Sequence, residues 1–588
     1  MSVNFEPQRG GGVTSVTVKI TGGPPMTLYN QATPHNDSMG DEMMSGKVFP
    51  VSNSLSSVPA AAGVSVPGLP LVSVDRAPIV RLSTILQELA SHREERWKRR
   101  GKAAELKLHW RAVAIQHMLQ VVPGETILEL GAGSGLLTKQ LDNLLHGENS
   151  ITSVVFSRNL FAQAARCRLP GVDLRSGDSL DTVPSARFDY VIGSGMLWHP
   201  RFIECLSWIQ RVLKPGGQML FFDSNFYWPS RQFNELRSLP DEFKNYPLKF
   251  PQVLKACEDA GFDDIHLTPH DIVSCRLGVR LMTQLQSKAI LLEHMPVVNY
   301  ACASMCMLAR KRGERAKPEP NLADQPALYG TVSVVVPAHN EARNIDNLVG
   351  RLLRSYGPYI HEIIIVNDNS KDDTIEVVRR LAASEPRLRL INRSKPNGVG
   401  LALKDGYRAA TGQYILSMDC DFVEILPQFR GLFRTIAEGH DGAIGSRFSH
   451  ESILVNYPFA KLFFNRLCHG IIKLFLLSTV RDISNNLKLY RTEILKDLDI
   501  SSRHFSANLE TGLKPLLAGH DIVEVPISWI NRTSTMGSSS FYLRKVGLAY
   551  ARTLLACWRQ DRTEARGLLP LAWRRILKAV RRTSPHLL

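Results

Sequence analysis

Two aspartates separated by a single residue follow a short apolar segment in the second half of the chain. The segment Tyr414-Ile-Leu-Ser-Met-Asp-Cys-Asp-Phe422 reads as a buried β-strand that runs into Asp419 and Asp421. Side chains alternate along an extended chain, so positions two apart project to the same side. Two carboxylates in this arrangement can hold one hard divalent cation, which in turn can neutralise a diphosphate. The alternative is an Asp-rich turn after a strand, and the neighbouring segments favour the metal site.

The segments before these aspartates alternate between strand, loop and helix. Thr331-Val-Ser-Val-Val-Val336 is the continuous apolar kind of strand found in parallel sheets, and it leads into Pro337-Ala-His-Asn-Glu341 and a helix. Glu362-Ile-Ile-Ile-Val366 repeats the pattern and leads into Asn367-Asp-Asn-Ser370. Repeats of this kind place their loops at the carboxyl edge of one sheet, where α/β folds bind ligands. The pattern therefore predicts that the third repeat delivers both aspartates to that edge.

A glycine-rich loop in the first half of the chain indicates another α/β unit. Glu125-Thr-Ile-Leu-Glu-Leu130 reads as a strand, Gly131-Ala-Gly-Ser-Gly135 as a tight loop, and residues 136–145 as a helix. Glycines spaced by two let the backbone approach a ligand closely, beside the partial positive charge of a helix N-terminus. The spacing differs from the G-x-G-x-x-G of dinucleotide sites.

This loop, in the form E-x-G-x-G-x-G, resembles that of class I S-adenosylmethionine-dependent methyltransferases. Further segments follow in that family's order over residues 97–311: Leu174-Arg-Ser-Gly-Asp178, Phe188-Asp-Tyr-Val-Ile192 and Arg211-Val-Leu-Lys-Pro-Gly-Gly217. The resemblance implies S-adenosylmethionine as a cofactor. Its implied binding residues are Glu129, Gly131, Gly133, Gly135 and Asp178.

One position departs from the methyltransferase pattern. The family usually carries Asp or Glu at the end of its second strand, where the carboxylate binds both ribose hydroxyls. In Ile151-Thr-Ser-Val-Val-Phe-Ser157 we expect Ser157 at that place, and a serine cannot supply a pair of acceptors. An active methyltransferase and a non-catalytic scaffold that docks a partner both stay open. His199 is a candidate general base for an oxygen acceptor, with packing or capping as its alternative role.

The second half resembles family-2 glycosyltransferases of the GT-A fold, closest to the polyprenyl (dolichol) phosphate sugar synthases. The resemblance covers residues 331–558. Its segments, in the family's order, are Val336-Pro-Ala-His-Asn-Glu341, Val366-Asn-Asp-Asn-Ser370, Gly398-Val-Gly-Leu-Ala402, Asp419-Cys-Asp421, Gly445-Ser-Arg447, Arg481-Asp-Ile-Ser-Asn485, and Glu524-Val-Pro-Ile527 with Arg532 and Gly537-Ser538. The expected fold class is thus α/β with two domains, a Rossmann-like methyltransferase fold followed by a GT-A fold.

The glycosyltransferase resemblance implies a role for each matching position. Pro337 and Glu341 would line the nucleotide pocket, and Asp368 would contact the base or ribose. Asp419 and Asp421 would hold Mg²⁺ or Mn²⁺ on the diphosphate of a nucleotide-sugar donor. These residues together would form the donor site.

Two arginines and one glutamate complete the implied catalytic set. Arg447 and Arg532 would clamp phosphate oxygens, for which a planar guanidinium is suited. Glu510 is the candidate base for an alcohol acceptor, and a structural acid is its alternative role. Asn367 and Val423 depart from the residues of close relatives, so the donor sugar and the acceptor are not assigned by the motifs.

The predicted organisation has five parts. A mostly disordered arm covers residues 1–90, the methyltransferase-like domain 91–311, a linker 312–330, the glycosyltransferase domain 331–560 and a basic amphipathic tail 561–588.

The nine cysteines are scattered and form no CxxC pair, which favours a reducing compartment. The net charge of +16 comes without a zinc finger, a basic zipper or an RNA-binding strand motif, so nucleic acid is not an expected partner.

Two stretches have the pattern of a helix that lies on a membrane. Residues 453–480 mix aromatic and aliphatic side chains with spaced basic ones, and no apolar run reaches membrane-spanning length. In the tail, one helical face carries Leu569, Trp573, Ile576, Leu577 and Val580, and the other carries Arg574, Arg575, Lys578, Arg581 and Arg582. Such a helix suits an anionic bilayer surface, although packing on its own domain is the alternative. We expect a cytoplasmic protein attached peripherally to the inner face of a membrane.

The leading functional hypothesis is transfer of a hexose from a nucleotide-sugar to a polyprenyl phosphate by metal-assisted inverting displacement. The runner-up is glycosylation of an alcohol on a glycan or small molecule, with the first domain methylating the same product. A third hypothesis makes the first domain a scaffold.

Overall fold

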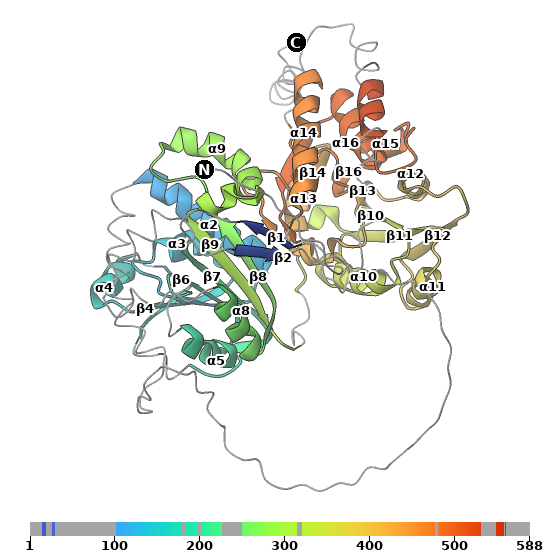
Figure 1. Ribbon diagram of the computed structural model, residues 1–588. Helices are drawn as coiled ribbons and strands as arrows, with labels where there is room; N and C mark the ends of the chain where they lie inside the picture. The colour runs from blue at the N-terminus through green and yellow to red at the C-terminus, as the bar shows by residue number, and fades with distance from the viewer. Residues whose placement is uncertain are drawn as a thin grey trace, which may run out of the picture. The chain divides into compact units, whose positions relative to one another are not determined.

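The computed structural model describes residues 15–18, 26–29, 101–167, 169–177, 180, 183–197, 202–225, 250–313, 320–455, 457–476, 480–530, 549–557 and 559. In the N-terminal unit, Met1–Ser73, strand β1 (Ser15–Val18) pairs antiparallel with β2 (Met26–Tyr29). The basic tail lies outside the described residues. The rest of the described chain contains two seven-stranded sheets (Figure 1).

The first seven-stranded sheet has the order β5-β4-β3-β6-β7-β9-β8. Its strands are β3 (Thr126–Leu130), β4 (Ser150–Val155), β5 (Val172–Ser176), β6 (Phe188–Ser194), β7 (Leu213–Ser224), β8 (Phe262–His270) and β9 (Ser304–Lys311). The strands from β5 to β7 are parallel, and β9 runs antiparallel to both β7 and β8. The chain order reverses between β3 and β6, and α/β sheets bind ligands at the carboxyl ends of strands at such a point.

Helices cover both faces of this sheet because its strand residues alternate between two apolar clusters. The helices are α2 (Lys102–Leu119), α3 (Leu136–Leu144), α4 (Arg158–Arg166), α5 (Phe202–Val212), α8 (Phe250–Asp259) and α9 (Val279–His294). Leu128 packs in one cluster with residues of α5 and α8, whereas Ile127 packs in the other with residues of α2 and α3. This two-sided burial explains why β3 reads as a continuous apolar run.

The second seven-stranded sheet has the order β12-β11-β10-β13-β16-β14-β17. Its strands are β10 (Val332–Ala338), β11 (Ile360–Asp368), β12 (Leu388–Arg393), β13 (Tyr414–Ser417), β14 (Gly442–Ser446), β16 (Lys488–Arg491) and β17 (Ile522–Pro526). Strands β12, β11, β10 and β13 are parallel, while β16 is antiparallel to β13 and β14. A two-stranded sheet pairs β15 (Leu454–Val455) with β18 (Trp529–Ile530).

The second sheet also lies between two helical layers. The helices are α10 (Ala342–Tyr356), α11 (Thr374–Ser384), α12 (Val399–Ala409), the 3₁₀ helix η4 (Phe422–Phe429), α13 (Arg430–Ala437), α14 (Phe459–Leu476), α15 (Thr492–Lys496) and α16 (Ala507–Leu517). Val334 packs with residues of α10 and α13, and Val335 packs with residues of α12 and α16. Figure 1 shows α10 below the strands β10 to β12 and α12 above them.

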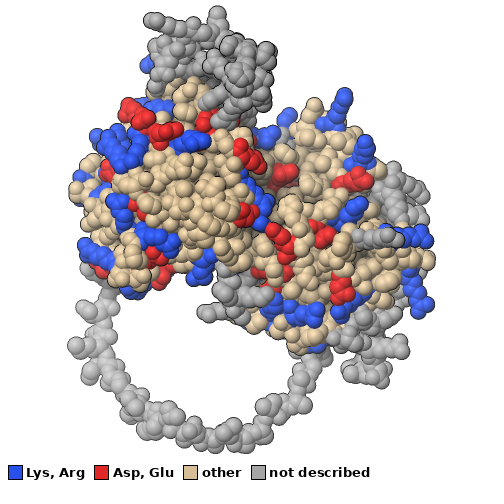
Figure 2. Space-filling model, turned by 180° about the vertical axis from the view of Figure 1, so that it is seen from behind, with Lys and Arg blue, Asp and Glu red and all other residues tan. Residues whose placement is uncertain are grey.

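The predicted fold class is confirmed: a methyltransferase-like α/β sheet precedes a GT-A-like one. On the face seen in Figure 2, Lys and Arg side chains are interspersed with Asp and Glu. Basic and acidic side chains are therefore mixed on that face.

Candidate active site

The two aspartates lie immediately after β13, as their spacing predicts. The backbone N–H of Met418 donates to the carbonyl of Val335 across 3.2 Å, which extends the pairing of β13 with β10 by one residue. Asp419 and Asp421 are half-buried, and Cys420 between them is buried with its thiol toward the carbonyl of Pro337 at 3.7 Å. The alternation of buried and half-buried positions places both carboxylates at the carboxyl edge of the sheet.

Negative charge accumulates at this edge. Burial, and next the charge of Asp421, raise the pKa of Asp419 to about 6, and Glu341 contributes in the same direction. The side-chain amide of Asn486 donates a hydrogen bond of 2.8 Å to Oδ1 of Asp419. A divalent cation would relieve the repulsion between these carboxylates.

The residues present fit a cation shared with a substrate. Among the residues that the structure describes, no group of three or more His, Cys, Asp or Glu is arranged to hold a metal alone. Magnesium is commonly bound through one or two carboxylates plus substrate phosphates. Asp419 and Asp421 match that requirement, and the remaining ligands would come from a donor diphosphate and water.

Two loops beside the aspartates are fastened to each other. The N–H of Asn340 donates to the hydroxyl of Ser370 at 2.9 Å, and the N–H of Lys371 donates to Oδ1 of Asn340 at 2.8 Å. Asn340 and Asn369 both have positive φ angles, 58° and 56°, a conformation that asparagine tolerates better than most residues. The bonds hold the loop after β10, which contains Glu341, against the loop after β11.

Asp368, at the end of β11, anchors the loop that precedes α12. Its carboxylate forms an ion pair with Arg393 and accepts the N–H of Gly398 at 2.6 Å. The carbonyl of Asp368 faces Nδ1 of His339 at 2.9 Å. The expected contact of Asp368 with a base or ribose stays a prediction. A carboxylate oxygen has a second lone pair with which to make it.

Arg447, directly after β14, is held by a buried carboxylate. Its Nε and Nη2 donate to the two oxygens of Asp482 at 2.7 and 3.0 Å, and its backbone N–H donates at 3.1 Å. Although burial alone would raise the pKa of Asp482, the charge of Arg447 lowers it. Within the described residues these bonds leave Nη1 of Arg447 without a protein acceptor.

A second arginine, Arg466 on α14, lies beside this pair. Its guanidinium carbon is 3.7 Å from the ring centroid of Phe448, and its Nη2 donates to the carbonyl of Arg481 at 2.5 Å. Burial lowers the pKa of Arg466 to about 10, and the charge of Arg447 acts in the same direction. Arg447 pairs directly with Asp482, and the charge of Arg466 also lowers the pKa of Asp482. In the sequence, Arg466 is one of the spaced basic residues of 453–480, and no motif marks it as a site residue.

Glu510 has a structural environment. Its carboxylate accepts hydrogen bonds from the N–H and hydroxyl of Ser501, from the N–H of Ser502 and from Nζ of Lys514, at 2.8 to 3.0 Å. Burial alone would raise the pKa of Glu510, but the bonds from Lys514 and Ser502 lower it. The geometry favours the structural role over the general base. The other predicted residues Arg532, Asp178 and His199 lie outside the described residues.

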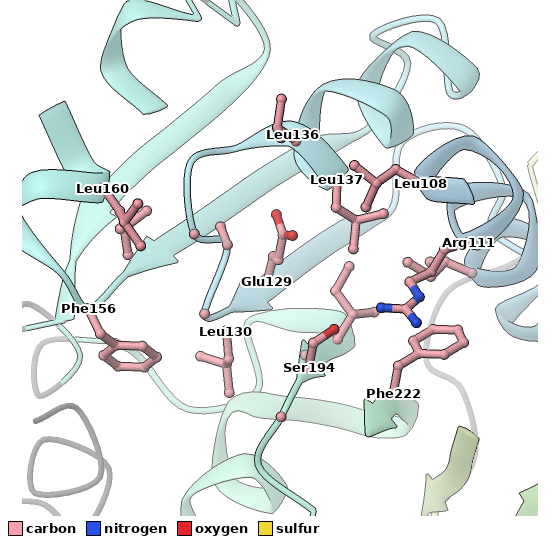
Figure 3. A pocket seen from close by; sticks show the side chains of 18 of the residues that line it. Leu108, Arg111, Glu129, Leu130, Leu136, Leu137, Phe156, Leu160, Ser194 and Phe222 are labelled. Atoms are coloured by element: carbon pink, nitrogen blue, oxygen red, sulfur yellow. The ribbon is translucent and has the colours of Figure 1, made fainter. Parts of the chain in front are cut away.

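The glycine loop of the first domain borders a cavity of about 90 Å³ at the carboxyl ends of β3, β4 and β6 (Figure 3). Gly131, Gly133 and Gly135 have φ angles of 76°, 60° and 79°, which glycine adopts without strain. These glycines fit the backbone of a cofactor-binding loop. Glu129 is buried below them and accepts hydrogen bonds from Thr138 at 2.6 Å and Ser153 at 2.8 Å.

The end of the second strand of this domain differs from the sequence-based expectation. Strand β4 ends at Val155, and Ser157 is the N-cap residue of α4 two positions later. The family's ribose-binding carboxylate is therefore replaced by a valine rather than by a serine. The glycine loop fits S-adenosylmethionine, but the strand end does not fit its ribose.

Comparison with known proteins agrees with these two folds. The protein-family model described as "Glycosyl transferase family 2" matches residues 333–499, and the family model described as "Methyltransferase domain" matches residues 127–217. The glycosyltransferase AglD of Haloferax volcanii is 30% identical over 205 residues, which are 34% of this chain and 33% of AglD. The dolichol-phosphate mannosyltransferase of Pyrococcus furiosus is 28% identical over 203 residues, 34% of this chain and 56% of that enzyme. The chain thus spans a third to about half of the length of these two relatives.

A further relative is covered more fully. The polyprenol monophosphomannose synthase of Mycolicibacterium smegmatis is 27% identical over 206 residues, 34% of this chain and 77% of that enzyme. Among solved structures, glucosyl-3-phosphoglycerate synthase of Mycobacterium tuberculosis is 17% identical with a TM-score of 0.32, over 41% of this chain and 82% of that one. A Bacillus halodurans protein described as a putative methyltransferase is 18% identical with a TM-score of 0.24, over 34% and 98%. The chain contains a methyltransferase domain followed by a family-2 glycosyltransferase domain related to the dolichol phosphate mannose synthases.

Proposed function

We propose that the second domain transfers a hexose from a nucleotide-sugar to a polyprenyl phosphate. The observation that carries the proposal is the pair Arg447 and Arg466 around Asp482, with Arg466 on a helix that exposes apolar side chains. An anion-binding pair beside an apolar surface suits an acceptor that has a phosphate head and a lipid tail. Two relatives named for mannosyl transfer to dolichol or polyprenol phosphate support the acceptor class.

The donor side is supported by the acidic edge of the sheet. A divalent cation bound there supplies charge neutralisation to the departing nucleoside diphosphate. Asp419 and Asp421 would hold that cation, and Asn486 would keep Asp419 in place. Pro337 near the end of β10 and Glu341 in the loop after that strand would position the nucleotide. Such preorganisation is the main source of rate enhancement in transfer of this kind.

A phosphate acceptor does not require a general base. In the proposed reaction a phosphate oxygen of the acceptor attacks the anomeric carbon with inversion, and the bond to the nucleoside diphosphate breaks. A lipid phosphate is already anionic at neutral pH, so no proton has to be removed from it. The engagement of Glu510 with Ser501, Ser502 and Lys514 agrees with such an acceptor.

Helix α14 supports attachment to a bilayer surface. Phe463, Phe464, Leu467 and Ile471 are 45%, 49%, 51% and 39% exposed, although all are large and apolar. An apolar helix face of this kind can enter the boundary between head groups and acyl chains. In the described part of the chain, every helix is too short or too polar to cross a membrane. The exposed apolar face of α14 is the feature that supports peripheral attachment.

The test compares polyprenyl phosphate with the corresponding polyprenol as acceptors for one nucleotide-sugar. The full chain should convert only the phosphate, and the product should be soluble in organic solvent and labile to acid. Arg466→Gln should raise the KM for polyprenyl phosphate by about tenfold, the value of one charge-assisted hydrogen bond. Lys473→Gln, on the same helix, is the control and should leave this KM unchanged. Transfer to the polyprenol, or to water-soluble alcohols instead, would contradict the proposal.

A further inference from the structure

The pocket of the first domain departs from a methyl-donor site at the end that would hold the ribose. It lies where the chain order of the sheet reverses, and Figure 3 shows Glu129, Phe156, Ser194 and Arg111 around it. S-adenosylmethionine carries a sulfonium cation, an ammonium group, a carboxylate and a ribose diol. Acceptor oxygens and carboxylates must therefore be available in any pocket that binds it well.

An apolar cluster occupies the place of the ribose acceptor. Val155, the last residue of β4, is buried in contact with Ala132 of the glycine loop and with Leu160 and Ala164 of α4. The neighbouring Phe156 is also buried and lines the pocket. A ribose diol at this strand end would lose its hydrogen bonds to water and meet carbon atoms instead. Burying hydroxyl groups without new partners is unfavourable.

Glu129 does not replace the missing carboxylate. It is the acidic residue among the described residues that line the pocket. Thr138 and Ser153 both donate to its Oε2, at 2.6 and 2.8 Å, from the side of the domain core. Burial raises the pKa of Glu129 despite these two bonds. The two hydrogen bonds hold the Glu129 carboxylate between β4 and α3 rather than at the end of β4.

The opposite end of the pocket carries positive charge. Arg111 lies 4.9 Å from the ring centroid of Phe222, and its Nη2 donates to Asp271 at 2.6 Å. Asp271 also pairs with the buried Lys107 at 2.9 Å, so two cations share this carboxylate. Arg111 at this end suits the carboxylate of S-adenosylmethionine, so the misfit lies at the ribose end of the pocket.

We infer that the first domain does not bind S-adenosylmethionine as a methyl donor, because Val155 stands where the ribose carboxylate is required. The domain keeps the methyltransferase fold without its chemistry. This inference does not depend on the proposed sugar transfer. It removes the hypothesis that the two domains glycosylate and methylate one product.

The test titrates the full chain with S-adenosylmethionine and with S-adenosylhomocysteine in a calorimeter. Binding should be undetectable at concentrations that saturate ordinary methyltransferases. Val155→Asp should tighten binding by about ten- to a hundredfold, which corresponds to a pair of charge-assisted hydrogen bonds. Val155→Leu is the matched control, because it changes the side chain without adding an acceptor, and should give no gain.

Two results would overturn the inference. One is micromolar binding of either compound to the unaltered chain. The other is a Val155→Asp variant that has the melting temperature of the unaltered chain but does not bind more tightly. If that variant unfolds, the unaltered chain still decides the question through the direct titration and through incorporation of a labelled methyl group.

Discussion

Asn486 donates a hydrogen bond of 2.8 Å from its side-chain amide to Oδ1 of Asp419, although the two residues lie on neighbouring antiparallel segments far apart in sequence. The amide oxygen of Asn486 accepts the hydroxyl of Ser417 at 2.9 Å, and that hydroxyl accepts the phenol of Tyr407 at 2.8 Å. Asn486, Ser417 and Tyr407 are all buried. The chain of bonds fixes the orientation of one carboxylate of the proposed metal site.

Replacing Asn486 by alanine should weaken metal binding more than it slows turnover. Residues that orient a metal ligand commonly contribute about ten- to a hundredfold in affinity. We expect an increase of that size in the dissociation constant for Mn²⁺, measured by electron paramagnetic resonance, and a smaller fall in kcat at saturating metal. Asn485→Ala is the control, because the amide of Asn485 donates to the carbonyl of Gly445 and not to Asp419. Equal metal affinity in both variants would exclude the positioning role.

Glu510→Gln should reduce stability rather than catalysis. The substitution keeps the shape of the side chain but removes the negative charge that accepts hydrogen bonds from Ser501, Ser502 and Lys514. Loss of a buried charged hydrogen-bond partner costs about 1–3 kcal/mol, so the melting temperature should fall. The kcat of the folded variant should stay within several-fold of the unaltered chain, whereas removal of a general base costs about 10²–10⁴-fold. Retained stability with a loss of kcat in that range would restore the catalytic role of Glu510.

The exposed face of α14 should contribute to vesicle binding. Substituting both Leu467 and Ile471 by serine removes apolar surface that a bilayer would bury, which is worth up to about 1.5–3 kcal/mol per side chain. We expect a fall of about tenfold or more in the partition onto anionic phospholipid vesicles in sedimentation assays. The matched control substitutes Leu281 and Ile203 of the first domain, which are 44% and 39% exposed. Equal losses for the two pairs would argue against a specific membrane face.

The placement of the proposed donor-site residues could be predicted in large part from the sequence, because these residues sit in local motifs. Asp419 and Asp421 follow one strand, and because side chains alternate along an extended chain, both carboxylates point to the same side. Glu341 and Asp368 follow two other parallel strands, and parallel strands bring their carboxyl ends to one edge. These placements need only the order of strands and loops.

The contacts that join distant segments could not be predicted in this way. Asn486 reaches Asp419 because β16 inserts antiparallel beside β13, and no local pattern encodes that register. The pairing of Arg447 with Asp482 joins the end of β14 to the segment before β16, and Arg466 approaches them from α14. Each of these contacts depends on tertiary packing, which one-dimensional spacing does not specify.

The residue expected to bind the ribose shows how uncertain the end of a strand is when it is predicted from the sequence. The run from Ile151 to Ser157 has no glycine or proline to mark where the strand stops. Ser157 was expected at the strand end, whereas β4 ends at Val155. An error of two residues is within the usual uncertainty of strand boundaries. Here those two residues decide whether the ribose meets a serine hydroxyl, which is a weak acceptor, or a valine side chain, which offers no acceptor.

The most direct measurement is sugar transfer by the full chain, with a panel of labelled nucleotide-sugars, Mn²⁺ and polyprenyl phosphate. The unaltered chain should transfer label from one donor into the organic phase, and Asp421→Asn should lower this transfer by about a hundredfold or more. Asp346→Asn, which alters an exposed ion pair with Arg380, is the control and should behave as the unaltered chain. Transfer that persists in Asp421→Asn or after chelation of the metal would contradict the account. So would folded protein that transfers from no donor.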